Sequence, residues 1–175
     1  GSDGHVTVTG PGSSWVTTAY NINVGNFGTG TLTIQNGGLV RAVAGLDLGV
    51  SASDASGTLV LQGAGANLAV LETSSILAGQ GTASVTIDGG LLRGLGNRSA
   101  FFANFGARDV TFGANGAVID TNGYNLGIAP RLVGAGTLTK TGAGVLTLTG
   151  ANTYADATQV DAGRLDINGD QTGAA

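Results

Sequence analysis

Side chains that could do acid–base chemistry are few and scattered in this sequence. It has 11 acidic residues, seven basic residues, one histidine (His5) and no cysteine. Cleavage of an acidic polysaccharide needs two carboxylates, or a carboxylate with Ca²⁺ and a basic residue, on one face. Asp88 and Asp109 have no acidic counterpart in the neighbouring repeats described below, and Glu72 is the single glutamate. We therefore expect no catalytic residues and no enzyme activity, and keep a polysaccharide-cleaving site as a weak alternative.

Metal, cofactor and nucleic-acid binding also lack their sequence signatures. Neither the Gly-Gly-x-Gly-x-Asp nonapeptide nor the spacing of an EF-hand occurs, so we expect no metal site. Gly-x-Gly elements such as 63–65 and 134–136 precede no helical pattern, so we expect no nucleotide cofactor. Asn-Gly pairs such as Asn36-Gly37 are interpreted as turns. The net charge of −4 and the scattered basic residues argue against nucleic acid as a partner.

A strand-like apolar triplet recurs with nearly constant spacing over residues 6–112. The steps between the first residues of successive triplets are 26, 27, 26 and 25 residues. The triplets are Val6-Thr7-Val8, Leu32-Thr33-Ile34, Leu59-Val60-Leu61, Val85-Thr86-Ile87 and Val110-Thr111-Phe112. A fixed period of this size is typical of repeat proteins, in which each unit buries its apolar face against its neighbours.

Two further apolar runs in the repeat predict two more strands. Trp15-Val16 and Leu39-Val40 exemplify the second strand, and 22–25 and 46–49 exemplify the third. Turn residues separate these runs, and no segment sustains a helical apolar period. We therefore predict an all-β fold, a right-handed parallel β-helix (solenoid) with three short strands per rung of about 26 residues. Successive rungs would stack roughly 4.8 Å apart.

The period also assigns inward and outward positions. We expect a core ladder of Val8, Ile34, Leu61, Ile87 and Phe112. The Thr-rich row beside this ladder would face outward, which leaves an ice-binding face as a second weak alternative. Arg41 and Arg93 match across rungs, and Leu68 is expected to lie between them.

Composition agrees with a long coil that forms one domain. Glycine accounts for 33 of 175 residues and charged residues for 10%, well below the roughly 25% of an ordinary globular domain. No apolar run approaches the roughly 18 residues of a transmembrane helix, and no secretory signal pattern occurs. The leading Gly1-Ser2 suggests a fragment cut from a longer protein.

The last third of the sequence departs from the regular period. The step from Val110 to Leu138 is 28 residues, and beyond it the strand patterns come closer together. Residues 134–154 follow the order Gly-x-Gly-Thr-Leu-Thr-Lys-x-Gly-x-Gly-x-Leu-x-Leu-x-Gly-x-Asn-x-Tyr. This order resembles the autotransporter-associated β-strand repeat, also called the passenger-associated transport repeat. Its motif residues here are Gly134, Gly136, Thr137, Leu138, Lys140, Gly142, Gly144, Leu146, Leu148, Gly150, Asn152, Tyr154, Gly163 and Leu165.

The resemblance implies a passenger domain of a type V secreted protein. Such a passenger crosses the periplasm, threads through its cognate outer-membrane β-barrel, and is displayed on the bacterial cell surface or secreted. The implied division is 1–133 for regular rungs, 134–167 for the transport repeat continuing the same β-helix, and 168–175 for the fragment end. In the family the repeat is associated with secretion and folding, so we expect residues 134–167 to act as a folding seed.

The least regular stretch, 91–105, offers a candidate partner-binding loop. Arginine and aromatic side chains dominate binding hot spots, and this loop holds Arg93, Arg98, Phe101, Phe102 and Phe105. The favoured alternative places the three phenylalanines in the core. The first functional hypothesis is thus a structural and adhesive module that contacts the host cell surface or extracellular matrix. The second is a purely structural spacer whose binding functions lie elsewhere in the protein.

Overall fold

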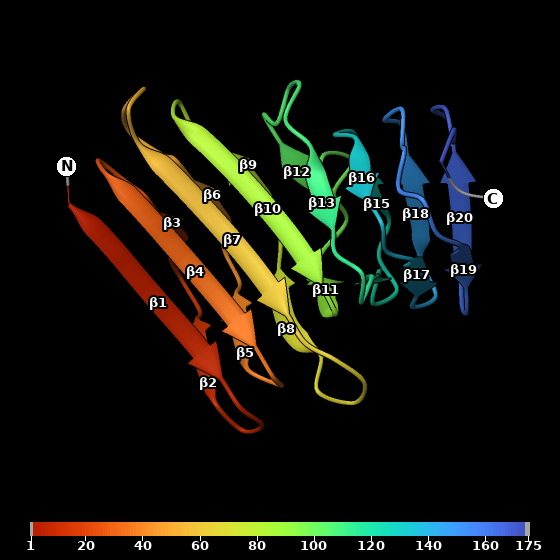
Figure 1. The fold of residues 1–175 in the computed structure, drawn as a ribbon, viewed down its shortest axis with the longest axis horizontal. Helices are drawn as coiled ribbons and strands as arrows, with labels where there is room; N and C mark the ends of the chain where they lie inside the picture. The colour runs from red at the N-terminus through yellow and green to blue at the C-terminus, as the bar shows by residue number, and fades with distance from the viewer. Residues whose placement is uncertain (1, 174–175) are drawn as a thin grey trace.

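The computed structural model describes residues 2–173 as one continuous coil of parallel strands, without a helix in that range. The axis of the coil runs from the N-terminus to the C-terminus, and the strands of the near sheet descend as the chain advances to the right (Figure 1). This geometry makes the coil right-handed. Every strand pairing in the sheets is parallel. The predicted parallel β-helix is therefore confirmed, and no described helix is long and apolar enough to cross a membrane.

Three faces wrap around the core, and each rung except the last contributes one strand to each face. The first sheet contains β1 (Asp3–Thr9), β4 (Thr29–Gln35), β7 (Ser56–Gln62), β10 (Thr82–Asp88), β13 (Val110–Phe112) and β16 (Leu132–Gly134). The second contains β2 (Ser14–Thr17), β5 (Leu39–Ala42), β8 (Ala69–Thr73), β11 (Gly90–Gly94), β14 (Ala117–Asp120), β17 (Leu138–Thr141) and β19 (Thr158–Val160). The third face is split into two sheets. The first of these contains β3 (Ile22–Val24), β6 (Leu46–Leu48), β9 (Ile76–Ala78) and β12 (Phe102–Ala103). The other contains β15 (Leu126–Ile128), β18 (Val145–Leu148) and β20 (Arg164–Ile167).

Alternation along each strand builds the core. The predicted ladder is confirmed, because five residues occupy consecutive paired positions and are buried: Val8, Ile34, Leu61, Ile87 and Phe112. Burying one aliphatic side chain contributes roughly 1.5–3 kcal/mol, so a ladder that continues across rungs is the main stabilising feature. The Thr-rich row faces outward, as expected. At the corner after β4, Asn36 and Gly37 both have positive φ (52° and 86°), which confirms the turn.

The rungs become shorter toward the C-terminus, which corrects the expected step of 28 residues. Val110 pairs with Leu132, only 22 residues on, whereas Leu138 lies in the second sheet opposite Ala117. The error has a simple source, since the Gly-Thr-Leu-Thr run at 136–139 has the same residue types as the first-sheet run at 30–33. The closer spacing of later strands is confirmed. The expected boundary between 133 and 134 falls inside β16, and the division into regions stays a prediction.

Narrowing of the coil leaves a seam on the third face. β12 pairs with β9 of the preceding rung. β15 does not pair with β12, and its contact with the preceding rung is an isolated bridge between Leu126 and Arg98. We call residues 97–103 and β15 the seam. Three buried phenylalanines fill the interior here, with edge-to-face ring contacts at centroid separations of 5.7 Å (Phe101–Phe102) and 5.2 Å (Phe102–Phe105). The break in the sheet is thus compensated by aromatic packing.

Candidate functional site: the last rungs and their buried lysine

The predicted repeat motif folds into the last rungs of the coil. Leu165 is partly buried against the core, and the other large side chains of the motif are buried: Leu138, Lys140, Leu146, Leu148, Asn152 and Tyr154. Most of its glycines lie at corners or against the preceding rung. The motif therefore describes a rung that combines an apolar interior with closely stacked corners.

Lys140 is the single lysine of the chain, and its side chain is fully buried. The Nζ atom donates to the carbonyl oxygens of Thr141 (2.7 Å), Gly142 (2.7 Å) and Ala162 (2.9 Å). It also lies 3.1 Å from the hydroxyl of Thr121. Thr121 follows β14, Thr141 ends β17 and Ala162 precedes β20. One ammonium group therefore connects three successive rungs, and we call this arrangement the lysine link.

Electrostatics of the lysine link depend on hydrogen bonding more than on ion pairing. Burial lowers the pKa of Lys140 below its ordinary value of 10.5, and the charge of Asp120 opposes part of this effect. No carboxylate of residues 2–173 lies within salt-bridge distance of its Nζ. Three carbonyls and one hydroxyl replace the water that the ammonium loses. Leu-Thr-Lys-Thr alternation places Lys140 on the same side as Leu138, so the sequence contained a signal for its burial.

Tyr154 and Asn152 fix the segment that follows β18. The Tyr154 ring is fully buried, lies 5.6 Å from the Phe112 ring, and its hydroxyl hydrogen-bonds the hydroxyl of Thr158 at 2.5 Å. Burial raises the pKa of Tyr154, partly offset by this hydrogen bond. The Asn152 Oδ1 accepts a hydrogen bond from the backbone of Leu132 at 2.9 Å. Residues 152–155 thus continue the first sheet although they form no regular strand.

Two of the motif glycines illustrate why a side chain is not tolerated. Gly142 has φ +77°, a conformation that residues with a Cβ rarely adopt. At Gly144 a Cβ atom would overlap the backbone carbonyl of Tyr124 in the preceding rung. Both positions therefore keep the lysine link and its neighbouring rungs at normal strand spacing.

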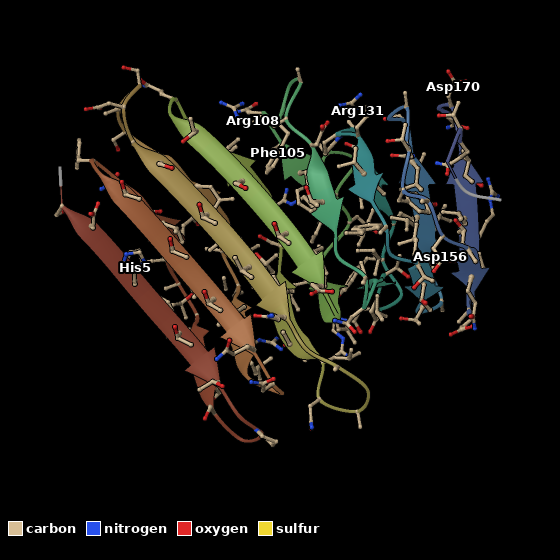
Figure 2. All side chains as sticks on the ribbon, viewed as in Figure 1. His5, Phe105, Arg108, Arg131, Asp156 and Asp170 are labelled. Carbon is tan, nitrogen blue, oxygen red and sulfur yellow. The ribbon has the colours of Figure 1, made fainter. Side chains whose placement is uncertain are left out.

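The structure separates the residues of the candidate partner-binding loop. All three phenylalanines are buried, which confirms the core alternative for them. Arg93 lies on β11 and is ion-paired, and Arg98 is exposed at the seam. Figure 2 shows Phe105 and Arg108 at the loop between β12 and β13. A role for the two arginines in partner binding stays a prediction.

A ladder of alternating charges crosses the outer face of the second sheet. Glu72 accepts from Arg41 (2.6 Å) and Arg93 (2.8 Å), and Arg93 donates to Asp120 (2.8 Å). The hydrogen bond with Asp120 is the main reason that the pKa of Arg93 is raised.

This ladder corrects the expected alignment of Leu68 with the arginines. The turn 63–68, closed by pairing between Ala64 and Asn67, shifts the register so that Glu72 lies level with Arg41 and Arg93. Charged side chains that looked unaligned in the sequence therefore neutralise one another across rungs. Sequence reasoning missed the ladder because the turn length controls it.

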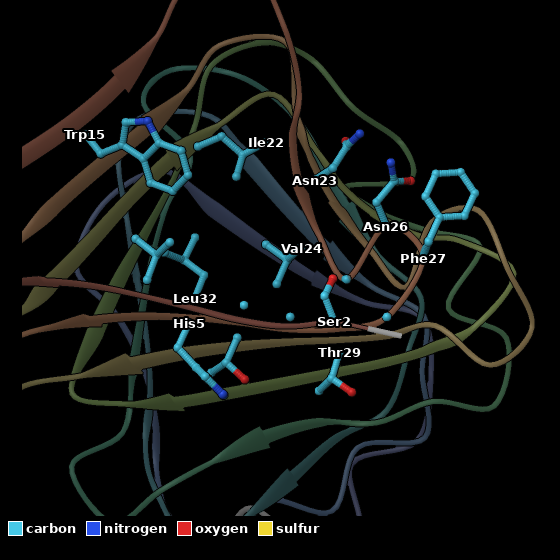
Figure 3. Close-up of a pocket in the computed structure, with 16 residues that line it drawn as sticks. Ser2, His5, Trp15, Ile22, Asn23, Val24, Asn26, Phe27, Thr29 and Leu32 are labelled. Carbon is cyan, nitrogen blue, oxygen red and sulfur yellow. The ribbon is translucent and has the colours of Figure 1, made fainter.

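A hollow of about 390 Å³ lies at the first rung, where the interior of the coil is open. Trp15, Ile22, Val24 and Leu32 surround it (Figure 3). His5 lies at its margin with an exposed side chain. The lining contains no carboxylate, and residues 2–173 contain no group of three or more His, Asp or Glu side chains placed to hold a metal ion.

Comparison with known proteins assigns the last rungs to a family. Residues 138–167 match the family model described as passenger-associated-transport-repeat. The match begins at the first residue of β17 and ends at the last residue of β20, so it includes Lys140, both of the glycines above and Tyr154. No curated protein and no solved structure shows significant similarity to the chain. The expected resemblance of the C-terminal segment is thereby confirmed.

Proposed function

We propose that this chain, which carries a passenger-associated transport repeat at residues 138–167, is a stretch of an autotransporter passenger. In this proposal it crosses the periplasm, passes through its outer-membrane β-barrel, and is displayed on the bacterial surface or released. The repeat and the parallel β-helix that contains it support this assignment. The role is structural and adhesive, and no catalytic step is part of it.

The lysine link is the observation that carries the role of the repeat in folding. In a solenoid each rung contacts only its neighbours, so the first rungs to form gain little before a second and third have joined them. Lys140 connects three rungs through one side chain. In a single isolated rung the ammonium keeps the carbonyls of Thr141 and Gly142 but lacks the Thr121 hydroxyl of the preceding rung and the Ala162 carbonyl of the following rung. The repeat therefore favours formation of several rungs together, which is what a folding seed outside the membrane requires.

Surface display of the full-length protein tests this role. We expect Lys140→Met to reduce the fraction of passenger exposed on the cell surface several-fold relative to the total passenger produced. Arg164→Gln provides a matched control, because Arg164 belongs to the same repeat but lies exposed in a pair with Asp166. Antibody labelling of intact and lysed cells measures both quantities. Equal display of Lys140→Met and the control would contradict a folding role for the link.

The adhesive role is separable from the folding role. Purified chain that binds saturably to host cells or extracellular matrix supports an adhesive module, whereas a chain that binds neither is a spacer. The charges of the second-sheet ladder neutralise one another, so a charged ligand is expected to bind elsewhere on the surface. The seam offers the most specific candidate.

A further inference from the structure

The seam opens outward into a groove of about 610 Å³ that crosses three rungs and combines apolar surface with a few polar side chains. Residues 97–99, residues 125–127, and Thr147 with Thr149 border it in successive rungs. Its floor includes Gly127, where a Cβ would overlap the carbonyl oxygen of Ser99. The groove therefore exists because the third face is interrupted, while Gly127 lets the backbone of Ser99 stack closely on the floor.

Arg98 gives the groove a positive charge that the described protein does not neutralise. Four other arginines are ion-paired: Arg41, Arg93, Arg131 and Arg164. Arg108 donates to three backbone carbonyls. Arg98 is exposed, and within residues 2–173 its guanidinium makes neither kind of contact. Its backbone is nevertheless fixed, donating to Asn125 (2.8 Å) and accepting from Gly127 (2.7 Å).

Two asparagines beside Arg98 present aligned donors. The Oδ1 of Asn97 accepts from the backbone of Asn125 (2.8 Å), and the Oδ1 of Asn125 accepts from the backbone of Val145 (3.1 Å). Each oxygen is thus anchored on the next rung, which fixes the carboxamide and leaves its NH₂ group for a ligand. Hydroxyls of Ser99, Thr147 and Thr149 complete the border.

The geometry points to this groove as a binding site for an oligosaccharide that bears carboxylates. A guanidinium binds a carboxylate with two parallel hydrogen bonds, and amide and hydroxyl groups pair with sugar hydroxyls. Rungs are spaced roughly 4.8 Å apart, close to the length of one pyranose unit, so a chain along the axis would meet one set of donors per rung. The volume lies within the roughly 300–1,000 Å³ of small-ligand sites. This inference rests on the adhesive part of the proposed function and names its ligand class.

The test uses the purified 175-residue chain and amide NMR spectra, so it does not depend on display. We expect trigalacturonate or a hyaluronan hexasaccharide to shift the amides of 97–99, 125–127 and 147–149, and a preference between them identifies a plant or animal source. Arg98→Gln should weaken binding at least tenfold, because the charge-assisted pair is lost. Arg164→Gln, which removes another exposed arginine that lies outside the groove, should bind as the wild type does.

Three results would overturn the assignment: no shift with either acidic probe, equal binding of neutral maltotriose, or unchanged binding by Arg98→Gln. Unperturbed amides in the first rungs of Arg98→Gln show that this variant is folded. If the chain binds neither acidic probe but Lys140→Met still reduces display, the folding role stands without the binding site. If Lys140→Met is displayed normally but the chain binds the probes through Arg98, the binding site stands without the folding role. The two proposals can therefore fail separately.

Discussion

Replacing Lys140 with methionine is expected to lower the free energy of unfolding of the last rungs by about 3 kcal/mol, since buried polar groups left unpaired cost roughly 1–3 kcal/mol each. Methionine keeps most of the apolar stem but removes the donor to the carbonyls of Gly142 and Ala162, whereas the Thr141 carbonyl keeps its hydrogen bonds from Thr121. Urea unfolding followed by circular dichroism measures the change. Arg164→Gln should cost less than about 1 kcal/mol, as is usual for exposed ion pairs.

Alkaline pH separates the hydrogen bonds of the lysine link from its charge. Because burial lowers the pKa of Lys140 in the folded state, the unfolded chain binds this proton more tightly. The contribution of Lys140 to stability therefore rises as pH increases from its folded pKa toward 10.5, where the unfolded group titrates. The difference between wild type and Lys140→Met should grow over that window. A difference that shrinks there would show that the ammonium charge, not hydrogen bonding, stabilises the site.

Replacing Tyr154 with alanine is expected to destabilise the same rungs by about 4 kcal/mol, in the range of large aromatic-to-alanine changes in cores. The side chain is fully buried against Phe112, and its removal leaves a cavity that the closely stacked rungs cannot fill. Tyr154→Phe is the matched control, because it keeps the ring and removes only the hydrogen bond with Thr158, which is worth about 1 kcal/mol.

The position of the rungs that Tyr154→Ala destabilises is as informative as the loss of stability. Stability of a solenoid is distributed along its axis, so hydrogen exchange should accelerate in β17 to β20 of Tyr154→Ala and much less in β4 to β7. Uniform acceleration along the chain would show that the rungs unfold as one cooperative unit. Equal effects of the alanine and phenylalanine variants would contradict the packing role of the ring.

Local patterns predicted the fold because each rung repeats the same alternation of apolar residues and the same kinds of turn residue. Alternation along 32–34 and 59–61 orients the inward ladder, and Asn36-Gly37 provides a corner of the required handedness. The period then determines which strands pair. Neither inference needs information from distant residues, which explains their success.

Properties that depend on how many residues separate two strands were not predictable in the same way. The turn 63–68 shifts Glu72 into line with Arg41 and Arg93. The Gly-Thr-Leu-Thr run at 136–139 resembles the first-sheet run at 30–33, so Leu138 was wrongly expected to follow Val110 in the first sheet. The groove arises because Arg98 pairs with Leu126 while Phe102 pairs with Ile76. The burial of Lys140 differs from these cases, since alternation in Leu-Thr-Lys-Thr is a local signal that could have indicated it.

Acylation of the single lysine is the most direct test of the central claim, that Lys140 is sealed inside the coil as a link between three rungs. The folded chain is treated with an amine-reactive acetate ester at neutral pH, and peptide mass spectrometry quantifies modification at Lys140 separately from the α-amine. We predict that Lys140 reacts at least 100-fold more slowly in the folded chain than in urea, because its Nζ is buried and hydrogen-bonded, and that Tyr154→Ala accelerates the reaction; 100-fold corresponds to about 2.7 kcal/mol of opening free energy. Modification of the folded wild-type chain at the rate of the unfolded chain would contradict the account.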